Sequence, residues 1–495
     1  MGQPDLLVIG LDLGTTRCKA VAVARTGEVA ASATSSYPLH SPEPGWAEQS
    51  ALDVWQGAAA ALQQLCRQVP AEQLGAISLS GAMHSLLPVD AAGEPLALAL
   101  TWADQRAAPQ AQAIRREADA QALYQRTGCP LQAIYHPAKL RWWHETQPDV
   151  ARRAAYFVTI KDWVLWRLAG VWTTDQGLAS TTGLLDIHQL RWDAQALALA
   201  GITANQLPEL KPPAQAAGAV TGQAAAATGL PAGLPVVAGT SDGGAANLGS
   251  GAVRAGQSVI TIGTSGAVRR VVAQPLLDGA ARTWCYVLVE GRWFAGGAIN
   301  NAGLALQWVR ERFYPDVPGD AGYQRLLADA AEVPPGAEGV TFLPYLSGER
   351  SPYWNPAARA LISGLSLAHS RAHVARAVLE GVAYCLADVW QVLNTGEPIG
   401  EVRLTGNVTH DPLWAQIVAD VLGVPLLADE AADASALGAA RLGHLALGQI
   451  TGLDDLASAA SGRSYEPDPA RHALYESGHA VFQELYRKLE PQPAA

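Results

Sequence analysis

The chain has 495 residues, of which 49% are hydrophobic, and its formal net charge is −11. This length exceeds what one ordinary hydrophobic core supports, so we expect two domains. The acidic balance argues against a nucleic-acid partner, because phosphates favour a basic surface. The sequence has no basic leader and no apolar stretch long enough to span a bilayer, which predicts a cytoplasmic protein without a membrane partner.

The first element is an apolar run at residues 6–11, which predicts a buried strand. The turn DLGTT at 12–16 follows it, and residues 19–24 predict a return strand. Glycine lets the backbone approach a ligand, and successive N–H groups with threonine hydroxyls form a cradle for an anion. The turn is therefore a candidate phosphate-binding hairpin, although a Gly-Thr hairpin is also a common turn.

Helical and strand patterns alternate along the middle of the chain, which predicts an α/β protein. We expect a helix over 53–68, a strand over 76–80, mainly helical structure over 121–170 and a connector over 205–235. A strand over 235–238 then leads to the segment TSDGG at 240–244. We place the domain boundary near Leu248, which gives expected domains 1–248 and 249–495.

A second glycine turn, GTSG at 263–266, lies between predicted strands over 258–262 and 267–273. Helices are expected beyond it over 303–313, 370–393 and 412–422. One cradle in each half suggests a polyphosphate held between two similar lobes. The sequence has no Gly-Lys dipeptide and no G-x-G-x-x-G, so the P-loop and Rossmann phosphate sites are excluded.

Nine segments, in this order, resemble the FGGY family of carbohydrate kinases. They are DLGTTRCK at 12–19, WAEQ at 46–49, GAMHS at 81–85, TWADQR at 101–106, IKDW at 160–163, TSDG at 240–243, TIGTSG at 261–266, NNAGLALQW at 300–308 and LPYLSGERSPYWNP at 343–356. As a set they are highly specific. The spelling of AMHSL, TWADQR and SDG is more similar to gluconokinases than to xylulokinases.

The resemblance implies two ribonuclease-H-like domains of the actin-like ATPase type, with a catalytic cleft between them. It implies a kinase that uses ATP and Mg²⁺ to phosphorylate a small open-chain sugar or sugar acid. D-gluconate is the expected substrate, and D-xylulose or another pentulose or polyol is the alternative. The sequence also allows a homodimer.

The resemblance also assigns the reacting groups. Asp242 matches the family's general base, which would accept the proton of the sugar's terminal hydroxyl. Asp12 would hold a hydrated Mg²⁺ that bridges the terminal phosphates. Phosphate contacts are implied for the first turn at Gly14, Thr15, Thr16 and Lys19. The plainer alternatives are that Asp242 is a turn aspartate and that Asp12 caps its own turn.

Substrate contacts are implied for two segments and one helix, at Met83, His84, Trp102, Asp104, Arg106 and Lys161. A sugar acid needs a cation for its carboxylate. His84, Arg106 and Lys161 are the candidates, and the sequence does not choose among them. A salt bridge between Lys161 and Asp162 is the structural alternative for that lysine.

Nucleotide contacts are implied for the second half, at Gly263, Thr264, Gly303, Gln307, Gly406, Asn407 and Asp411. The family's adenosine motif usually reads T-G-G, whereas this chain has Asn407 after Gly406 and a carboxylate at Asp411. Asparagine tolerates a left-handed backbone better than other non-glycine residues, so we expect the turn to survive.

Two readings from other classes remain open. Actin-like ATPase modules also serve as chaperones and filament subunits, and a degenerate member of the family could bind a sugar without turnover. The expected sugar segments, around His84 and Trp102, argue against a chaperone or filament. The intact Asp12 and Asp242 argue against a sugar sensor that lacks activity.

Overall fold

The computed structural model describes residues 6–396, 398–429, 433–456 and 462–489. The fold divides into two compact units that interleave along the chain. Unit 1 comprises residues 1–254, 271–295 and 432–459, and unit 2 comprises 255–270, 296–431 and 460–495. The single boundary expected near Leu248 stays a prediction.

The sheet of unit 1 has six strands in the order β13-β14-β5-β1-β2-β3. Its strands are β1 (Leu7–Leu13), β2 (Arg17–Val23), β3 (Val29–Ser36), β5 (Leu74–Gly81), β13 (Ala216–Ala219) and β14 (Pro235–Ser241). The hairpin β1–β2 is antiparallel, whereas β1 runs parallel to β5 and β5 runs parallel to β14. The first glycine turn therefore joins the two central strands of a mixed sheet.

The second sheet repeats this plan in the order β17-β18-β16-β15-β21-β22-β23. Its strands are β15 (Ser258–Ile262), β16 (Gly266–Val272), β17 (Trp284–Val289), β18 (Arg292–Ile299), β21 (Val402–Thr405), β22 (Leu426–Ala428) and β23 (Ser464–Tyr465). Again an antiparallel hairpin, β15–β16, lies beside parallel strands, β21 and β22. The repeated arrangement confirms the expected α/β class of two similar lobes.

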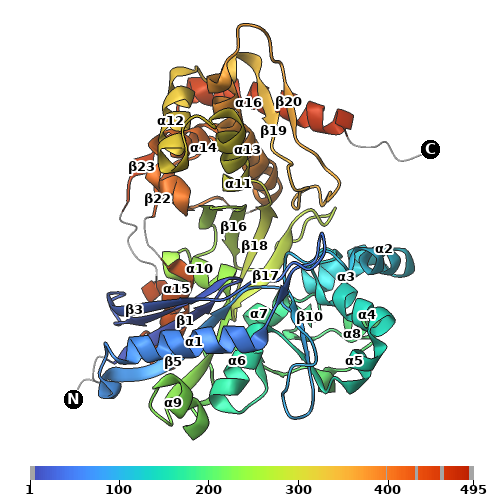
Figure 1. Ribbon diagram of the computed structural model, residues 1–495, viewed down its shortest axis with the longest axis vertical. Helices are drawn as coiled ribbons and strands as arrows, with labels where there is room; N and C mark the ends of the chain where they lie inside the picture. Colours follow the sequence, from blue (N-terminus) through green and yellow to red (C-terminus); the bar gives the residue numbers. More distant parts are fainter. Residues whose placement is uncertain (1–5, 397, 430–432, 457–461, 490–495) are drawn as a thin grey trace. The chain divides into compact units, whose positions relative to one another are not determined.

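Helices pack on these sheets according to the alternation of side chains along each strand. In β1, Ile9, Leu11 and Leu13 join the core that contains α1 (Ala51–Cys66), α6 (Ile160–Ala169) and α9 (Gly222–Thr228). Val8 points to the opposite face, against α15 (Ala434–Ala446). Figure 1 shows α1 along the sheet of β1 and β5.

The remaining helices of unit 1 are α2 (Ala108–Glu117), α3 (Ala120–Thr127), α4 (His136–Thr146), α5 (Pro148–Arg153), α7 (Gln176–Ser180), α8 (Ala194–Ala200) and α10 (Asp242–Ser250). Its short strands are β4 (Glu48–Gln49), β6 (Leu87–Val89), β7 (Ala99–Leu100), β8 (Tyr156–Val158), β9 (Thr173–Asp175), β10 (Leu185–Asp186), β11 (Arg191–Trp192) and β12 (Glu209–Lys211). The expectation of a connector over 205–235 was wrong, because this segment contains β12, the edge strand β13 and helix α9.

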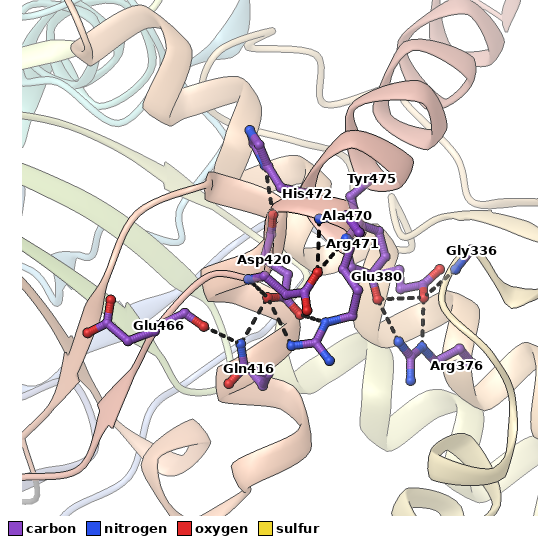
Figure 2. A network of polar contacts seen from close by, with 11 residues as sticks. Gly336, Arg376, Glu380, Gln416, Asp420, Glu466, Ala470, Arg471, His472 and Tyr475 are labelled. Carbon is purple, nitrogen blue, oxygen red and sulfur yellow. Dashed lines mark hydrogen bonds and ion pairs between the residues drawn. The ribbon is translucent and has the colours of Figure 1, made fainter.

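Unit 2 contains α11 (Gly303–Phe313), α12 (Gly319–Glu332), α13 (Arg371–Leu393), α14 (Pro412–Leu422) and α16 (Pro469–Leu489), with the hairpin β19 (Thr341–Leu343) and β20 (Leu361–Ser363). Figure 2 shows how polar contacts join three of these helices. Arg376 of α13 donates to Glu380 at 2.7 Å and to the Tyr475 hydroxyl of α16 at 2.5 Å. Asp420 of α14 lies 2.7 Å from Arg471 of α16.

Glycines allow α10 and α15 to cross at backbone contact, side by side (Figure 1). A Cβ added to Gly438 of α15 would lie 1.8 Å from the Ala245 carbonyl oxygen of α10. A Cβ added to Gly249 of α10 would lie 1.8 Å from the Ala434 carbonyl oxygen of α15. Neither contact leaves room for a side chain. Within the part of the chain that the structure describes, no helix is long and apolar enough to cross a membrane.

We expect Gly438→Ala to lower the free energy of unfolding by about 1–3 kcal/mol, because the added methyl group forces the two backbones apart. Urea unfolding followed by circular dichroism measures this change. Gly222→Ala in α9 is the matched control, because nothing lies within 4 Å of its added Cβ. That control should change stability by no more than about 1 kcal/mol. Equal stabilities of the two variants would contradict the close crossing.

Candidate active site

Three parallel strands of unit 1 end at the same edge of the sheet. Leu13 of β1 is in register with Gly81 of β5, and Gly81 is in register with Ser241 of β14. The segments that follow these strands are the first glycine turn, the segment with Met83 and His84, and the start of α10. Polar groups that follow parallel strands gather at this edge, which is where α/β proteins commonly bind ligands.

Asp12 lies at this edge, near two other carboxylates. It accepts a hydrogen bond from Ser80 Oγ at 2.8 Å. Burial, together with the negative charges of Asp242 and Asp433, raises the pKa of Asp12 to about 7, against the lowering effects of Ser80 and Arg17. Carboxylate oxygens are the ligands that Mg²⁺ prefers, so the Asp12 carboxylate is chemically suited to hold a hydrated magnesium ion.

Asp242 is the first residue of α10, directly after β14. The helix cap is the neighbouring Ser241, whose hydroxyl accepts the Gly244 N–H at 3.3 Å. Asp242 Oδ1 accepts the N–H of Gly243 at 2.8 Å. The capping role is thus filled by the serine, and Asp242 places a carboxylate at the helix N-terminus, where a negative charge is favoured.

The first turn is held by side chains from outside the hairpin. Gln49 Nε2 donates to the Thr15 carbonyl at 2.9 Å and to the Gly14 carbonyl at 3.2 Å. Trp102 Nε1 donates to Thr15 Oγ1 at 3.0 Å. Trp102, expected as a sugar contact, is therefore joined directly to the expected phosphate turn. Thr16 is exposed beside them.

Lys19 faces Asp12 across the β1–β2 hairpin and forms an ion pair with Asp433, just before α15. Asp433 was not among the residues predicted from the sequence. The lysine of this turn therefore has a carboxylate partner within unit 1.

His84 is buried and has a left-handed backbone with φ of 65°. Its Nδ1 lies 2.8 Å from the Thr181 carbonyl oxygen, which fixes Nδ1 as the protonated nitrogen. The ring packs edge-on against Tyr135, with 5.1 Å between centroids. A left-handed backbone is strained at a residue other than glycine, and such strain is common at functional sites. Met83 beside it is half-buried.

Arg106 is paired within the protein, and its side chain is only 2% exposed. It donates to Asp104 at 2.7 Å, contacts Glu48 at 2.8 Å, and its guanidinium lies 3.5 Å from the ring centre of Trp46. The Asp104 carboxylate also accepts the Ala47 N–H at 2.8 Å. Asp104 and Arg106 thus hold the segment at 101–106 against residues 46–48.

Lys161 is likewise buried and paired. Its Nζ lies 3.0 Å from Asp175 and 3.6 Å from Asp162, and it donates to the Ala238 carbonyl at 2.8 Å. Burial alone would lower the pKa of Lys161, but the two aspartates raise it above its ordinary value. The salt bridge considered as the structural alternative is present, with Asp175 as the nearer partner.

In unit 2, the second glycine turn contacts the start of α11. The Gly303 N–H donates to the Gly263 carbonyl at 2.8 Å, and the Leu304 N–H donates to the Thr264 carbonyl at 3.0 Å. A Cβ on Gly303 would lie 2.6 Å from the Gly263 carbonyl oxygen. Gln307 is exposed on the same helix and donates to Glu311 at 2.8 Å.

The expected adenosine turn lies at the adjacent strand end, because Thr405 Oγ1 of β21 is 2.8 Å from Thr261 Oγ1 of β15. The left-handed position is Gly406, with φ of 90°, whereas Asn407 begins a short 3₁₀ helix. The turn therefore does not depend on the tolerance of asparagine for a left-handed backbone. Asp411 caps α14 and accepts the N–H groups of Leu413 and Trp414.

The chain thus has two similar lobes, with a glycine turn beside half-buried carboxylates in unit 1 and a second glycine turn in unit 2. Models of the FGGY family of carbohydrate kinases match this chain: the N-terminal domain over residues 7–249 and the C-terminal domain over 258–447. The chain therefore belongs to the FGGY family of carbohydrate kinases and is a phosphotransferase. ATP as the phosphoryl donor follows from membership of this kinase family.

Individual relatives span nearly the whole chain. A gluconokinase of Bacillus subtilis (strain 168) is 34% identical over 98% of this chain and 96% of its own length. A xylulose kinase of Escherichia coli (strain K12) is 32% identical over 98% of this chain and 99% of its own length. The crystal structure of a gluconate kinase from Lactobacillus acidophilus matches with a TM-score of 0.93 at 29% identity, covering 98% of both chains.

We expect Asp12→Asn to stabilise the ligand-free protein at pH 8 but not at pH 4. Because its folded pKa of about 7 exceeds the ordinary value of an aspartate, the folded state keeps a proton that the unfolded chain loses between about pH 4 and 7. Stability from this group is therefore lost as the pH rises through that range. The gain at pH 8 should be roughly 1–4 kcal/mol.

Urea unfolding at both pH values measures the effect. Glu72→Gln, at an exposed carboxylate, is the control and should change stability equally little at both. A loss of stability in Asp12→Asn at pH 8 would show that the aspartate is not under strain in the free protein.

Proposed function

We propose that this kinase phosphorylates the terminal hydroxyl of an open-chain sugar acid, D-gluconate, with ATP and Mg²⁺. The observation that carries this proposal is the 34% identity with the Bacillus subtilis gluconokinase over nearly the full length of both chains. The amino-acid sequences of the motifs AMHSL and TWADQR in the substrate segments, which are similar to those of gluconokinases, support it.

Each expected residue has a role in the proposed reaction. Asp242 accepts the proton from the attacking hydroxyl, since its carboxylate lies at the sheet edge beside the substrate segments. Asp12 would hold Mg²⁺, which neutralises charge on the phosphates when bound. Thr15, Thr16 and Lys19 contact the transferred phosphate. In this role Lys19 exchanges its partner Asp433 for a phosphate oxygen.

The nucleotide is proposed to lie along unit 2. The turn at Gly263 and Thr264 would hold its phosphates, and Gly303 with Gln307 of α11 would lie beside it. Gly406 and Asn407 line the adenosine side. Asp411 supports that turn by capping α14 and so need not contact the base.

Recognition of the gluconate carboxylate cannot rely on a free arginine or lysine among the three cations expected from the sequence. Arg106 and Lys161 are each neutralised by two carboxylates. We propose that main-chain N–H groups of the two substrate segments donate hydrogen bonds to the carboxylate of the sugar acid, and that His84 Nε2 accepts one from a sugar hydroxyl.

D-xylulose is the second candidate substrate, because the Escherichia coli xylulose kinase is nearly as similar in sequence. We expect a higher kcat/KM with D-gluconate than with D-xylulose in a coupled ADP-release assay over sugars, sugar acids and polyols. A higher value with xylulose would reject the substrate but keep the kinase. If no compound in the panel leads to ADP release, the result would favour a sugar sensor. ADP release that needs no added compound would favour another ATPase.

We expect Asp242→Asn to lower kcat by about 10²–10⁴-fold while ATP binding stays within about threefold. Asparagine keeps the shape of the side chain but cannot accept the proton. The ADP-release assay gives kcat, and isothermal titration with a non-hydrolysable ATP analogue gives the nucleotide affinity. Near wild-type turnover would remove Asp242 from the role of base.

A further inference from the structure

Lys139 of α4 is a fully buried lysine, with 0% of its surface exposed, and no function described above uses it. Its Nζ donates to the His84 carbonyl at 2.6 Å and to the Thr101 carbonyl at 2.8 Å. One ammonium group thus joins the two segments that carry the expected sugar contacts. Lysine is suited to this task because its three donors can reach carbonyl groups from different segments.

Both ends of this bridge lead to groups of the candidate site. His84 holds a left-handed backbone with φ of 65°, which is costly for a residue other than glycine. Its carbonyl is fixed by Lys139 and its ring by the Thr181 carbonyl. A strained residue needs such contacts from both sides to stay in place.

On the other side, Thr101 precedes Trp102, whose indole N–H donates to Thr15 Oγ1 at 3.0 Å. The Thr101 N–H and hydroxyl both donate to the Ala47 carbonyl at 3.0 Å. Lys139 therefore holds the beginning of a short path that runs through Thr101 and Trp102 to the phosphate turn.

We propose that Lys139 is a positioning residue for the sugar substrate: its ammonium group fixes the main chains at His84 and Thr101 and so holds both substrate segments in their binding geometry. The inference rests on the proposed function, because it takes these segments as the sugar contacts. Hydrogen bonds from a charged donor are about twice as strong as neutral ones. The charge of Lys139 therefore matters as well as its reach.

The surroundings of Lys139 make its charge sensitive to pH. Burial lowers the pKa of Lys139 to about 7, an effect that Asp104 opposes and Arg106 reinforces. His136 also lies near it, and burial together with the charges of Lys139 and His84 lowers the pKa of His136 well below its ordinary value. Asp104 and Arg106 remain paired at 2.7 Å. Lys139 thus loses its proton as the pH rises through neutrality, and its hydrogen bonds to the two carbonyls weaken.

Lys139→Met keeps the length of the side chain and removes its donors. We expect the KM for the sugar substrate to rise at least tenfold and the KM for ATP to stay within about twofold. In the wild type, the sugar KM should rise about threefold to tenfold between pH 6 and 9. In Lys139→Met it should be high throughout.

Arg270→Met is the matched control. Arg270 is also buried, at 1% exposure, and its guanidinium donates to the Leu393 carbonyl at 2.7 Å and the Thr395 carbonyl at 3.2 Å in unit 2. Loss of a buried cation that binds carbonyls should destabilise this variant without a selective rise of the sugar KM. An equal rise in both variants would reduce the Lys139 effect to general destabilisation and overturn the proposal.

Hydrogen exchange of the sugar-free protein tests the bridge without any activity. Lys139→Met should speed exchange at residues 82–86 and 101–106 and leave α14 unchanged. A folded variant with wild-type exchange there and a wild-type sugar KM would overturn the proposal. If the variant does not fold, hydrogen exchange of the wild type at pH 6 and pH 9 provides the test of the bridge. The rates are corrected for the intrinsic effect of pH on exchange. Selective loosening of these segments supports the bridge, and uniform behaviour rejects it. A wild type inactive on every sugar rejects the proposed function alone.

Discussion

The close crossing of α10 and α15 is the constraint on which the site of unit 1 depends. Two glycines let each helix backbone contact the other, and Gly10 of β1 lets α15 approach the sheet, since a Cβ there would lie 1.9 Å from the Ala436 carbonyl oxygen. The starts of both helices are thereby placed at the edge where β1 ends. The carboxyl groups of Asp242, Asp433 and Asp12 lie at this edge because the backbones beneath them pack closely.

The sequence contained enough local information to predict the α/β class, the two glycine turns and most helices and strands. The strand expected over 258–262 and the helix expected over 303–313 have the bounds of β15 and α11. Membership of the kinase family, inferred from nine motifs, is confirmed. The roles of Asp12, Asp242 and the other expected site residues stay predictions, although the fold brings those of each unit to one sheet edge.

What could not be predicted depends on partners far apart in the chain. Asp433 pairs with Lys19 across 414 positions. Lys139 lies in an ordinary helical pattern, and nothing local indicates that its ammonium reaches two carbonyls of other segments. The free cations expected at Arg106 and Lys161 were hypotheses about charge alone. Their carboxylate partners Glu48 and Asp175 become visible only when the fold brings them together.

The pair of Lys161 with Asp175 also constrains how this family of sequences can diverge. Both side chains are fully buried, so replacing Lys161 alone leaves buried carboxylates without their counter-charge, and replacing Asp175 alone leaves Lys161 with only the more distant Asp162. A neutral version of the pair can be well tolerated, but each single replacement on the way to it is strongly unfavourable. Substitutions at these two positions are therefore expected to occur together in evolution. A protein that has the pair tends to keep it, because each variant with a single substitution is less stable.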